Sequence, residues 1–402
     1  MPKYDVTKLM YVRSESDRLI NKLDVDDYRV ALMKAARTKV RNAIKTAFTA
    51  AKTNETYMAR MNAAERTAFI NIEPRFWPQG SLAYGTQNMP SHTPPQQIDV
   101  DDGVYLPIEA LRDKPIVLKQ VFFEIVDTAL KELAVLENWG FDDQKSTCVR
   151  VELDAVTHLD VPLYAIPIER FDELQKAMGR AVLSREAVTD DGDINLRALL
   201  GEQKVYLALR ERPHWKESDP IRIQEWFEGE QKIFGSIFTR TCRYLKAWRD
   251  FNWFKGGPSS IALMICVWET FNDRKTKFYT DSEALLAVAR ELPARLEAGV
   301  KNPVAPEETV FPRDLDDIEF NSIIRQTTLF SEDIRTSLES GTSRLGVVET
   351  MIKHWGTRVP HRADWVVSAS SATAAVVTST PAEPQPKPEI ETMRSGTEFR
   401  SG

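Results

Sequence analysis

Apolar residues recur three or four positions apart in several long stretches of this sequence, which is the spacing of one face of an α-helix. In the first of these stretches the recurrence runs through Val30, Val40 and Phe48. Pro293 follows the last stretch and is expected to end it, because proline cannot donate the helical hydrogen bond. The pattern predicts helices over residues 26–52, 55–69, 116–137, 224–250, 259–271 and 281–292.

Runs of β-branched and aromatic residues predict strands between the early helices. "PRFWPQGS" is typical of a short strand that enters a tight turn at Gly80-Ser81, and "IDVDDGVYLP" is typical of a second strand. "TCVRVELD" and "THLDVPLYAIP" predict an antiparallel pair joined by a turn at residues 154–156. Because helices dominate after residue 221, the sequence indicates an α+β fold with a helical second part.

Composition narrows the class of protein. Apolar residues make up 42% and charged residues 28% of the 402 positions, an ordinary globular balance. The net charge of −6 makes a nucleic-acid partner improbable, because a large non-specific surface needs an excess of Lys and Arg. No apolar signal segment begins the chain and no run of about 18 apolar residues occurs, so a cytoplasmic protein without membrane contact is expected.

Cysteine usage and the composition of the C-terminal segment support this expectation. Cys148, Cys242 and Cys266 lie far apart without a CxxC spacing, which indicates free thiols in a reducing compartment. Residues 367–402 are rich in Ser, Thr, Ala and Pro and have few large apolar residues. Such a segment cannot bury enough surface to fold, so a flexible tail is expected there.

An acidic cluster carries the candidate chemistry. Side chains two residues apart on a strand point to the same face, about 6.6 Å apart, so Asp99 and Asp101 are expected to lie side by side. Asp102 then points away and is expected to cap the turn at Gly103. Asp160 stands alone on a later strand that is otherwise suited to burial. Three carboxylates from two adjacent strands suit two Mg²⁺ ions about 3.5–4 Å apart, which clamp attacking and leaving oxygens.

The turn upstream of this cluster makes the signal more specific than a lone D-x-D pair, which is usually a turn or a solvated strand end. Backbone N–H groups at a strand-to-helix turn such as Gly80-Ser81 attract phosphate, because they have no partner within the helix. The proline-rich loop between Ser81 and Asp99 is expected to be a rigid excursion without a catalytic role.

Other polar residues have two interpretations each. Arg37, Arg41 and Lys45 form a basic row on one helix, for which a solvated face is favoured over a phosphate site. His158 lies on the same strand face as Asp160, and a structural hydrogen bond is favoured over a role near the metals.

The order of Gly-Ser, D-x-D and a third Asp resembles the nucleotidyltransferase superfamily of DNA polymerase beta. The strings "PRFWPQGSLAYGTQNMP", "IDVDDGVYLP", "THLDVPLYAIP" and "YLKAWRDFNWFKGGPSSIAL" resemble the bacterial cGAS/DncV-like nucleotidyltransferases, nearest to the DncV-type cyclic GMP-AMP synthases of anti-phage (CBASS) operons. The resemblance implies a nucleotidyltransferase core with a mixed sheet and N-terminal helices in residues 1–220. A helical lobe in residues 221–366 would close over the nucleotides, with the active site in the cleft between the lobes.

The resemblance also implies roles for individual residues. Asp99 and Asp101 would hold two Mg²⁺ ions, with Mn²⁺ as an alternative, and Asp160 would complete the site and orient or deprotonate the attacking hydroxyl. Arg150 would contact the acceptor nucleotide, and Glu307 or Glu308 would fill the place of an acidic residue that reads a base. Residues of both lobes would bind the donor triphosphate, namely Gln79, Gly80, Ser81, Lys246 and Ser260, with Tyr84 packed nearby; Ser260 is also expected to be the N-cap of its helix.

The activity implied by the resemblance is a cyclic dinucleotide or oligonucleotide synthase that joins ATP, GTP or both by attack of a 3′-hydroxyl on an α-phosphate. The product would be a second messenger for a downstream effector in anti-phage defence. A ubiquitin-like ligase acting on Gly402 is a further implied partner. Two alternatives stay open: a template-independent transferase that makes linear products on RNA or a small molecule, and a catalytically silent nucleotide sensor.

Overall fold

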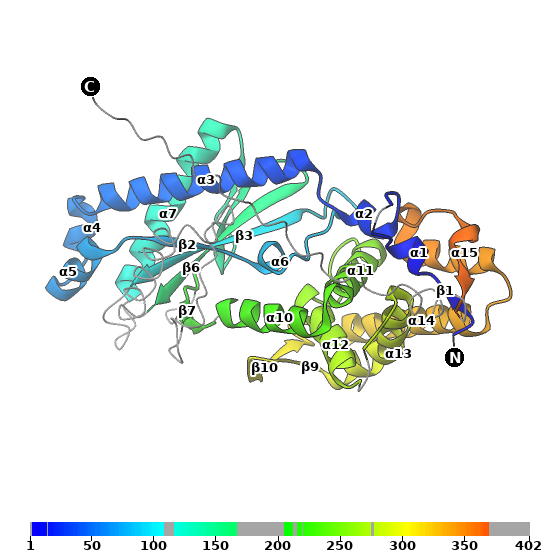
Figure 1. Cartoon of the computed structure of the whole chain (residues 1–402). Helices are drawn as coiled ribbons and strands as arrows, with labels where there is room; N and C mark the ends of the chain where they lie inside the picture. Colours follow the sequence, from blue (N-terminus) through cyan, green and yellow to red (C-terminus); the bar gives the residue numbers. More distant parts are fainter. Residues whose placement is uncertain are drawn as a thin grey trace, which may run out of the picture.

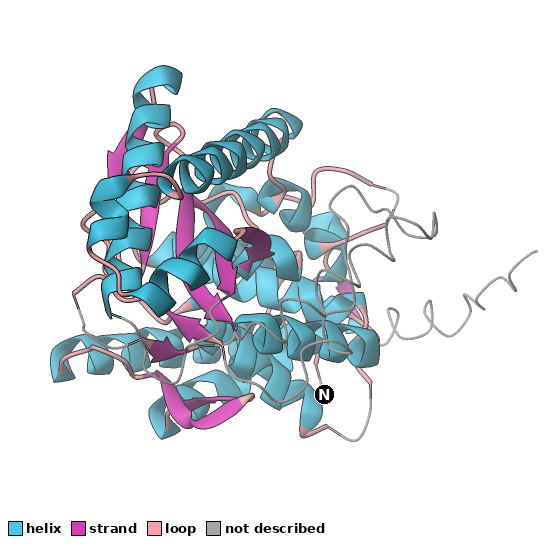
Figure 2. Ribbon diagram, turned by 90° about the vertical axis from the view of Figure 1, so that its left-hand side faces the viewer, coloured by secondary structure: helices cyan, strands magenta, loops and turns pink. Residues whose placement is uncertain are grey.

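A sheet-containing lobe and a helical lobe lie side by side in the computed structural model, which describes residues 2–13, 15–107, 116–166, 205–211, 215–218, 220–274 and 277–369 (Figure 1). Each lobe has a hydrophobic core of its own. The α+β class expected from the sequence is confirmed, and Figure 2 shows the sheet of the first lobe backed by helices.

Seven strands of the described residues form the mixed sheet of the first lobe, in the order β2-β3-β6-β5-β4, with β7 paired to β6 and β8 to β7. β3 and β6 run parallel, and the other pairs are antiparallel, including the predicted β5–β6 pair. The strands are β2 (Arg75–Gln79), β3 (Ile98–Pro107), β4 (Gly140–Asp142), β5 (Cys148–Glu152), β6 (Thr157–Ile166), β7 (Tyr206–Leu207) and β8 (Lys216–Glu217).

The two faces of this sheet have different neighbours. Helices α3 (Asp27–Ala51) and α7 (Ile116–Glu137) pack against each other and cover one face, where Val100, Val104 and Leu106 of β3 are fully buried (Figure 1). Because side chains alternate along a strand, Asp99 and Asp101 point to the opposite face. That face is turned toward the helical lobe.

The predicted helix over residues 55–69 is wrong as a single element. The chain forms α4 (Glu55–Ala59) and α5 (Ala63–Asn71) instead. Asn62 starts α5 with a capping box, in which its side chain accepts from the Glu65 N–H while the Glu65 carboxylate accepts from the Asn62 N–H. A new helix start of this kind satisfies backbone donors that a continuous helix would have used internally.

Asp102 forms a buried ion cluster with Arg37 and Arg41 of α3, so the turn cap expected of Asp102 and the solvated face expected of these two arginines are wrong, whereas Lys45 is exposed as expected. Arg41 donates from Nε and Nη2 to the two Asp102 carboxylate oxygens, each at 2.6 Å, and Arg37 Nη2 lies 3.4 Å from Oδ1. The Asp102 side chain is fully buried, and that of Arg37 is only 6% exposed. Asp102 therefore ties β3 to α3, and the face of α3 that carries these arginines is not solvated.

The second lobe is a bundle of helices with one small hairpin. Gly235, with φ of +75°, divides the predicted helix over residues 224–250 in two. Pro293 lies inside a helix that continues beyond it, because the buried Leu292 and Leu296 hold both sides of the proline in the core. The elements are α10 (Pro220–Phe234), α11 (Ser236–Asn252), α12 (Ser260–Asn272), α13 (Asp281–Ala298), β9 (Val300–Asn302), β10 (Ala305–Phe311), α14 (Asp317–Ser340), α15 (Arg344–Trp355), η2 (Gly356–Arg358) and η3 (Ala363–Trp365).

The N-terminal segment packs with the helical lobe, which corrects the expected composition of the domains. β1 (Tyr4–Asp5) pairs with β11 (Val367–Ser368), and the core of the helical lobe includes apolar residues of α1 (Thr7–Met10) and α2 (Leu19–Leu23). The first residues expected in the flexible tail are therefore paired in a strand. The remainder of that tail, including Gly402, lies outside the described residues.

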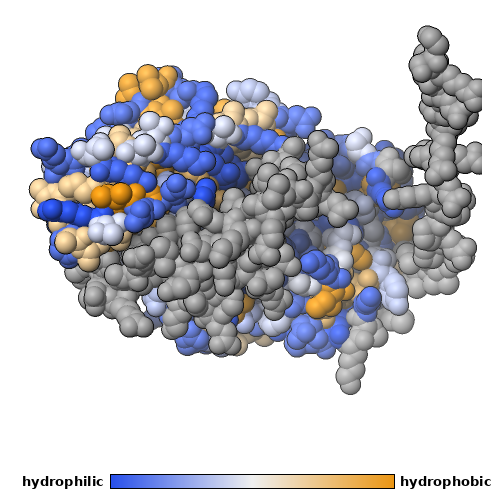
Figure 3. Space-filling model, turned by 60° about the vertical axis from the view of Figure 1, so that its left-hand side comes forward, coloured by the Kyte–Doolittle hydropathy of each residue, from blue (hydrophilic) through white to orange (hydrophobic). Residues whose placement is uncertain are grey.

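The surface seen in Figure 3 is mostly hydrophilic where it is coloured, with small separate apolar patches. Within the described part of the chain, none of the helices combines the length and the apolar character needed to cross a bilayer. The large apolar side chains are instead concentrated in the cores of the two lobes.

We predict that Asp102→Asn lowers the free energy of unfolding by about 3 kcal/mol, because removing one partner of a buried ion cluster leaves the other charges uncompensated. Chemical denaturation measures this effect. The matched control is Asp364→Asn, which removes an exposed carboxylate paired with Arg362 and is expected to change stability little. Equal stability of the two variants would contradict the structural role of Asp102.

Candidate active site

The parallel register of β3 and β6 brings the predicted acidic residues together. Asp101 lies opposite Asp160, and Asp99 lies opposite His158. One potential ligand atom from each of Asp99, His158 and Asp160 lies within 4.8 Å of the other two. The sheet thus gathers side chains from two strands that are about 60 residues apart in sequence, as the D-x-D pattern and the later Asp suggested.

Gly80 is required at the turn beside these carboxylates. It has φ of +61°, which L side chains rarely adopt, and a Cβ at this position would collide with the Asp101 carboxylate. The five-residue helix α6 (Gly80–Tyr84) follows directly, with Ser81 in its first turn. The predicted Gly-Ser turn is confirmed, and its glycine lets the backbone approach Asp101.

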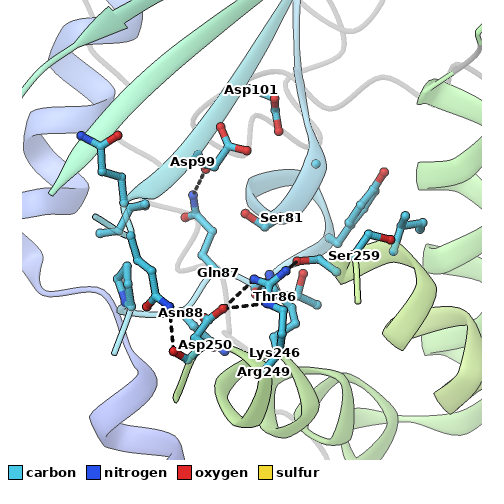
Figure 4. A pocket seen from close by; sticks show the side chains of 18 of the residues that line it. Ser81, Thr86, Gln87, Asn88, Asp99, Asp101, Lys246, Arg249, Asp250 and Ser259 are labelled. Carbon is cyan, nitrogen blue, oxygen red and sulfur yellow. Dashed lines mark hydrogen bonds and ion pairs between the residues drawn. The ribbon is translucent and has the colours of Figure 1, made fainter. Parts of the chain in front are cut away.

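Two cavities adjoin the carboxylates. The first has a volume of about 610 Å³ and lies between β3 and the helical lobe (Figure 4). The second, of about 590 Å³, lies beside β6 and the β9–β10 hairpin. Asp101 lines both cavities. The first is lined by nine of the residues singled out in the sequence, namely Gly80, Ser81, Tyr84, Asp99, Asp101, Arg150, His158, Lys246 and Ser260.

The carboxylates differ in their electrostatic surroundings. Burial, and then the charges of Asp99 and Asp160, raise the pKa of Asp101 well above its usual value. Burial alone would raise the pKa of Asp99 too, but the hydrogen bond and charge of His158, with smaller effects of Arg150 and Lys246, lower it overall. A divalent cation would relieve the repulsion at Asp101, so the residues present fit a metal site.

His158 and Arg150 each contact one of these carboxylates. His158 Nε2 lies 2.9 Å from Asp99 Oδ1, and its Nδ1 lies 2.9 Å from Gln97 Oε1. Arg150 donates to both Asp160 oxygens, at 2.6 and 2.7 Å. His158 therefore makes the favoured structural hydrogen bond, but it makes it to a candidate metal ligand. Arg150 neutralises Asp160 and also lines the first cavity.

Gln79 does not present its side chain to the first cavity. Its Nε2 donates to the Tyr105 hydroxyl at 2.6 Å, and its Oε1 accepts from the Tyr164 hydroxyl at 3.1 Å. The side chain is buried against the hydroxyl groups of these two rings, which stack on each other, and it lines the second cavity. The expectation that its side chain would help bind the same triphosphate as Ser81 is not supported by this placement.

The helical lobe contributes several side chains to the first cavity, and the sequence analysis predicted only some of them. Lys246 donates from Nζ to the Thr86 carbonyl oxygen at 2.6 Å. Ser259, not Ser260, is the N-cap of α12, and Ser260 Oγ instead accepts from Arg249 Nη1 at 3.0 Å. Arg249 was missed, although its position three residues after Lys246 places it on the same helix face.

The proline-rich loop was also undervalued. It lines the first cavity through six residues, Thr86, Gln87, Asn88, Pro90, Gln96 and Gln97. Asp99 and Asp101 project into the cavity from β3 near Ser81, and Lys246, Arg249 and Asp250 approach it from α11 (Figure 4). The loop thus forms part of the cavity wall, which the expectation of a rigid excursion without a catalytic role did not include.

In the second cavity, the structure distinguishes between the two candidate base-reading residues. Glu308 lines it and accepts from Lys216 Nζ at 3.1 Å and from Asn302 Nδ2 at 2.8 Å, whereas Glu307 is not among the lining residues. Burial raises the pKa of Glu308, but these two hydrogen bonds and the charge of Lys216 lower it more. Glu308 thus offers a carboxylate at the wall of a cavity that begins at Asp101.

The lowered pKa of the buried Lys246 predicts how the free energy of unfolding depends on pH. Burial, and then the charge of Arg249, lower its pKa to about 8, whereas an unfolded lysine has a pKa of about 10.4. Between these values the unfolded chain binds more protons, so stability rises with pH. Relative to Lys246→Met, the wild-type free energy of unfolding should increase by about 3 kcal/mol between pH 8 and 10.5. Denaturation at several pH values measures this difference, and a constant difference would contradict the shifted pKa.

Comparison with known proteins agrees with this geometry. Residues 74–164 match the family model described as "Cyclic GMP-AMP synthase DncV-like, nucleotidyltransferase domain", and residues 235–368 match "Cyclic GMP-AMP synthase, C-terminal domain". A cyclic GMP-AMP synthase of Escherichia coli is 32% identical over 429 residues, spanning 96% of this chain and 98% of its own length. The Vibrio cholerae enzyme of the same name is 32% identical over 318 residues, which span 74% of this chain and 71% of its own.

Solved structures show the same fold. The crystal structure of Vibrio cholerae DncV cyclic AMP-GMP synthase with the linear intermediate 5′ pppA(3′,5′)pG has a TM-score of 0.76 and 27% identity, covering 92% of this chain and all of the other. Escherichia coli DncV in its 3′-deoxy GTP bound form has a TM-score of 0.71 and 28% identity, with 91% of this chain and all of the other covered. This chain therefore belongs to the DncV-like cyclic GMP-AMP synthase family and is a nucleotidyltransferase.

Proposed function

We propose that this chain joins ATP and GTP in two steps into a cyclic dinucleotide, with release of pyrophosphate at each step. The observation that carries the proposal is the pairing that gathers Asp99, Asp101 and Asp160 on neighbouring strands: Asp99 and Asp101 line the first cavity beside the Gly80-Ser81 turn, and Asp101 and Asp160 line the second. The relatives named as cyclic GMP-AMP synthases, which align along nearly the whole chain, support this assignment.

Asp99 and Asp101, together with Asp160, are the residues proposed to hold the divalent cations. Their oxygens are the ligands that Mg²⁺ prefers, with Mn²⁺ as an alternative. Bound Mg²⁺ would activate the 3′-hydroxyl and neutralise charge on the phosphates. His158 would orient Asp99 through the bond between Nε2 and Oδ1, because the partners of a metal-binding carboxylate fix its direction.

The remaining residues would bind and align the nucleotides. The backbone N–H groups of the Gly80-Ser81 turn and the Ser81 hydroxyl can donate to the donor triphosphate, while Lys246 and Arg249 bring positive charge from α11. Arg150 lies at Asp160, next to the place proposed for the attacking hydroxyl. Phosphoryl transfer depends largely on such positioning and on charge stabilisation.

The second cavity is the place proposed for the acceptor base. It begins at Asp101 and Asp160 and reaches Glu308, so a nucleotide whose ribose lies at the carboxylates could extend its base toward Glu308. A carboxylate accepts hydrogen bonds from the amino and imino groups of a guanine edge. After the first step, the linear intermediate would exchange its ends between the two cavities so that the second bond can form.

A template-independent transferase that makes linear products, on RNA or on a small molecule, is the first alternative. It would leave a modified acceptor or a product sensitive to phosphatase. A silent nucleotide sensor is the second alternative, which would bind ATP without releasing pyrophosphate. The acidic cluster beside the phosphate-binding turn favours an active enzyme, because a sensor has no need for gathered carboxylates.

The proposed biological setting is anti-phage signalling, in which the cyclic product binds a downstream effector. We also propose a cytoplasmic location, supported by three cysteines that are all free and buried. A ubiquitin-like ligase acting on Gly402 remains a proposal from family resemblance, since that residue lies outside the described part of the chain.

We predict that the purified chain with ATP, GTP and Mg²⁺ forms a phosphatase-resistant dinucleotide and pyrophosphate, and that removing the metal with EDTA abolishes both. Mass spectrometry of the product and a pyrophosphate assay measure the two outcomes. Products that phosphatase degrades completely would exclude ring closure and favour the first alternative.

We also predict that Asp99→Asn and Asp101→Asn each reduce turnover about a thousandfold or more, because several kcal/mol of stabilisation by the metal would be lost. Mn²⁺ affinity, measured by calorimetry, should fall in the same variants while their thermal unfolding stays close to wild type. Asp364→Asn again serves as the control. Wild-type activity in either variant would contradict the proposed metal site.

A further inference from the structure

Residues 86–96, between α6 and β3, bind one side of α11 in the other lobe. Lys246 donates from Nζ to the Thr86 carbonyl oxygen at 2.6 Å. Asn88 and Arg243 exchange two hydrogen bonds of 2.9 Å: Asn88 Nδ2 donates to the Arg243 carbonyl oxygen, and Arg243 Nε donates to Asn88 Oδ1. Positions 243 and 246 lie on one helix face, so the loop follows that face along the helix.

Gln96 makes the contacts at the end of α11. Its Oε1 accepts from the backbone N–H groups of Ser91 and His92, both at 3.0 Å, which fix the amide to its own loop. Its Nε2 donates to the carbonyl oxygens of Asp250 and Trp253, both at 2.7 Å. A glutamine amide has two donor and two acceptor positions. Gln96 thus uses its full hydrogen-bonding capacity, half of it on each lobe.

The carbonyl groups that Gln96 binds belong to the C-terminal end of α11, where the last four carbonyl oxygens of a helix lack intrahelical donors. His92 binds a third, since its Nε2 lies 3.0 Å from the Phe251 carbonyl oxygen, and its ring stacks on Phe254 with centroids 4.2 Å apart. The last turn of α11 is therefore capped from the other lobe.

The same helix turn and the same loop lead directly to the first cavity. Arg249 and Asp250, in that last turn, line the cavity. On the loop side, Gln97 contacts His158, which contacts Asp99. Gln96 is three residues from Asp99, so a short piece of chain connects the cap of α11 to the carboxylates of β3.

We propose that Gln96 is a positioning residue that sets the distance between α11 and the carboxylates of β3, and so the distance at which Lys246 and Arg249 meet a nucleotide phosphate. The inference rests on the proposed function, because it assigns those two side chains to phosphate binding. Misplacement of reacting groups by about 1 Å can cost about a hundredfold in rate, so a side chain that holds both lobes has a measurable effect on the reaction.

Two variants of the full chain test this role. Gln96→Leu removes all four hydrogen bonds. Gln96→Glu keeps the size and both acceptors but turns an acceptor toward the carbonyl oxygens of Asp250 and Trp253. Gln144→Leu is the matched control, because Gln144 is an exposed glutamine in the loop after β4.

The first measurement is the distance between the lobes. Spin labels are attached in a Val135→Cys, Tyr279→Cys background, since both side chains are exposed, at 78% and 66%, and lie in different lobes. The three natural cysteines are buried and should not react. We expect a narrow distance distribution in the wild-type and control backgrounds and a broader or shifted one in both Gln96 variants.

The second measurement is steady-state kinetics without labels. We expect kcat/KM for ATP and GTP to fall about a hundredfold in the Gln96 variants, with a rise in KM, because displaced Lys246 and Arg249 would both bind and align the phosphates less well. A role in folding alone would reduce the amount of active protein but leave KM unchanged. Unchanged distance distributions, or broader ones with wild-type KM, would overturn the inference.

Failure of the proposed function can be distinguished from failure of the role proposed for Gln96. If the wild-type chain turned over no nucleotide, ATP affinity measured by calorimetry would replace KM, and the same comparison of variants would decide the role of Gln96. Weaker ATP binding together with a broader interlobe distance would support the inference, and wild-type affinity would overturn it.

Discussion

Parallel pairing of β3 with β6 is the constraint on which the cleft depends. It sets Asp101 opposite Asp160 and Asp99 opposite His158, so negative charge gathers on one face of the sheet. Arg150 offsets the charge of Asp160, and His158 that of Asp99, whereas the pKa of Asp101 stays high. This remaining repulsion is the property that makes the face suitable for divalent cations.

The neighbouring Asp102 points to the other face of the same strand, where its negative charge is fully paired with arginines. Alternation along β3 turns it toward α3, where Arg37 and Arg41 surround it in the protein interior. A buried carboxylate needs charged partners of this kind. Three acidic residues within four positions therefore divide their roles: one fastens the sheet to its helix, and two face the cavity.

Polar contacts join the two lobes at the cleft, beside apolar contacts such as that of Tyr84 with Phe227, while the two large apolar cores remain separate clusters. Asn88 and Gln96 donate to carbonyl oxygens of α11, and Lys246 of α11 donates to the Thr86 carbonyl oxygen of the loop. Hydrogen bonds are directional, so such an interface fixes geometry more narrowly than apolar contact of the same area does. A cavity in which phosphates must lie between a metal site and positive side chains depends on that fixed geometry.

Local patterns in the sequence determined the long helices, the strands around the acidic residues, the Gly80-Ser81 turn and the shared face of Asp99 and Asp101, because these follow from spacing along the chain. Asp160 was selected as a lone acidic residue on a later strand, and the family resemblance added the roles of these residues and the active site in a cleft between two lobes. Only the tertiary structure decided the partners of Asp102, the burial of Gln79 between two tyrosines, the continuation of α13 through Pro293 and the joining of α1 and α2 to the helical lobe. These features depend on packing in the folded molecule, with contacts such as that of Gln79 with Tyr105 joining residues 26 positions apart, and periodicity along the chain carries no information about such contacts.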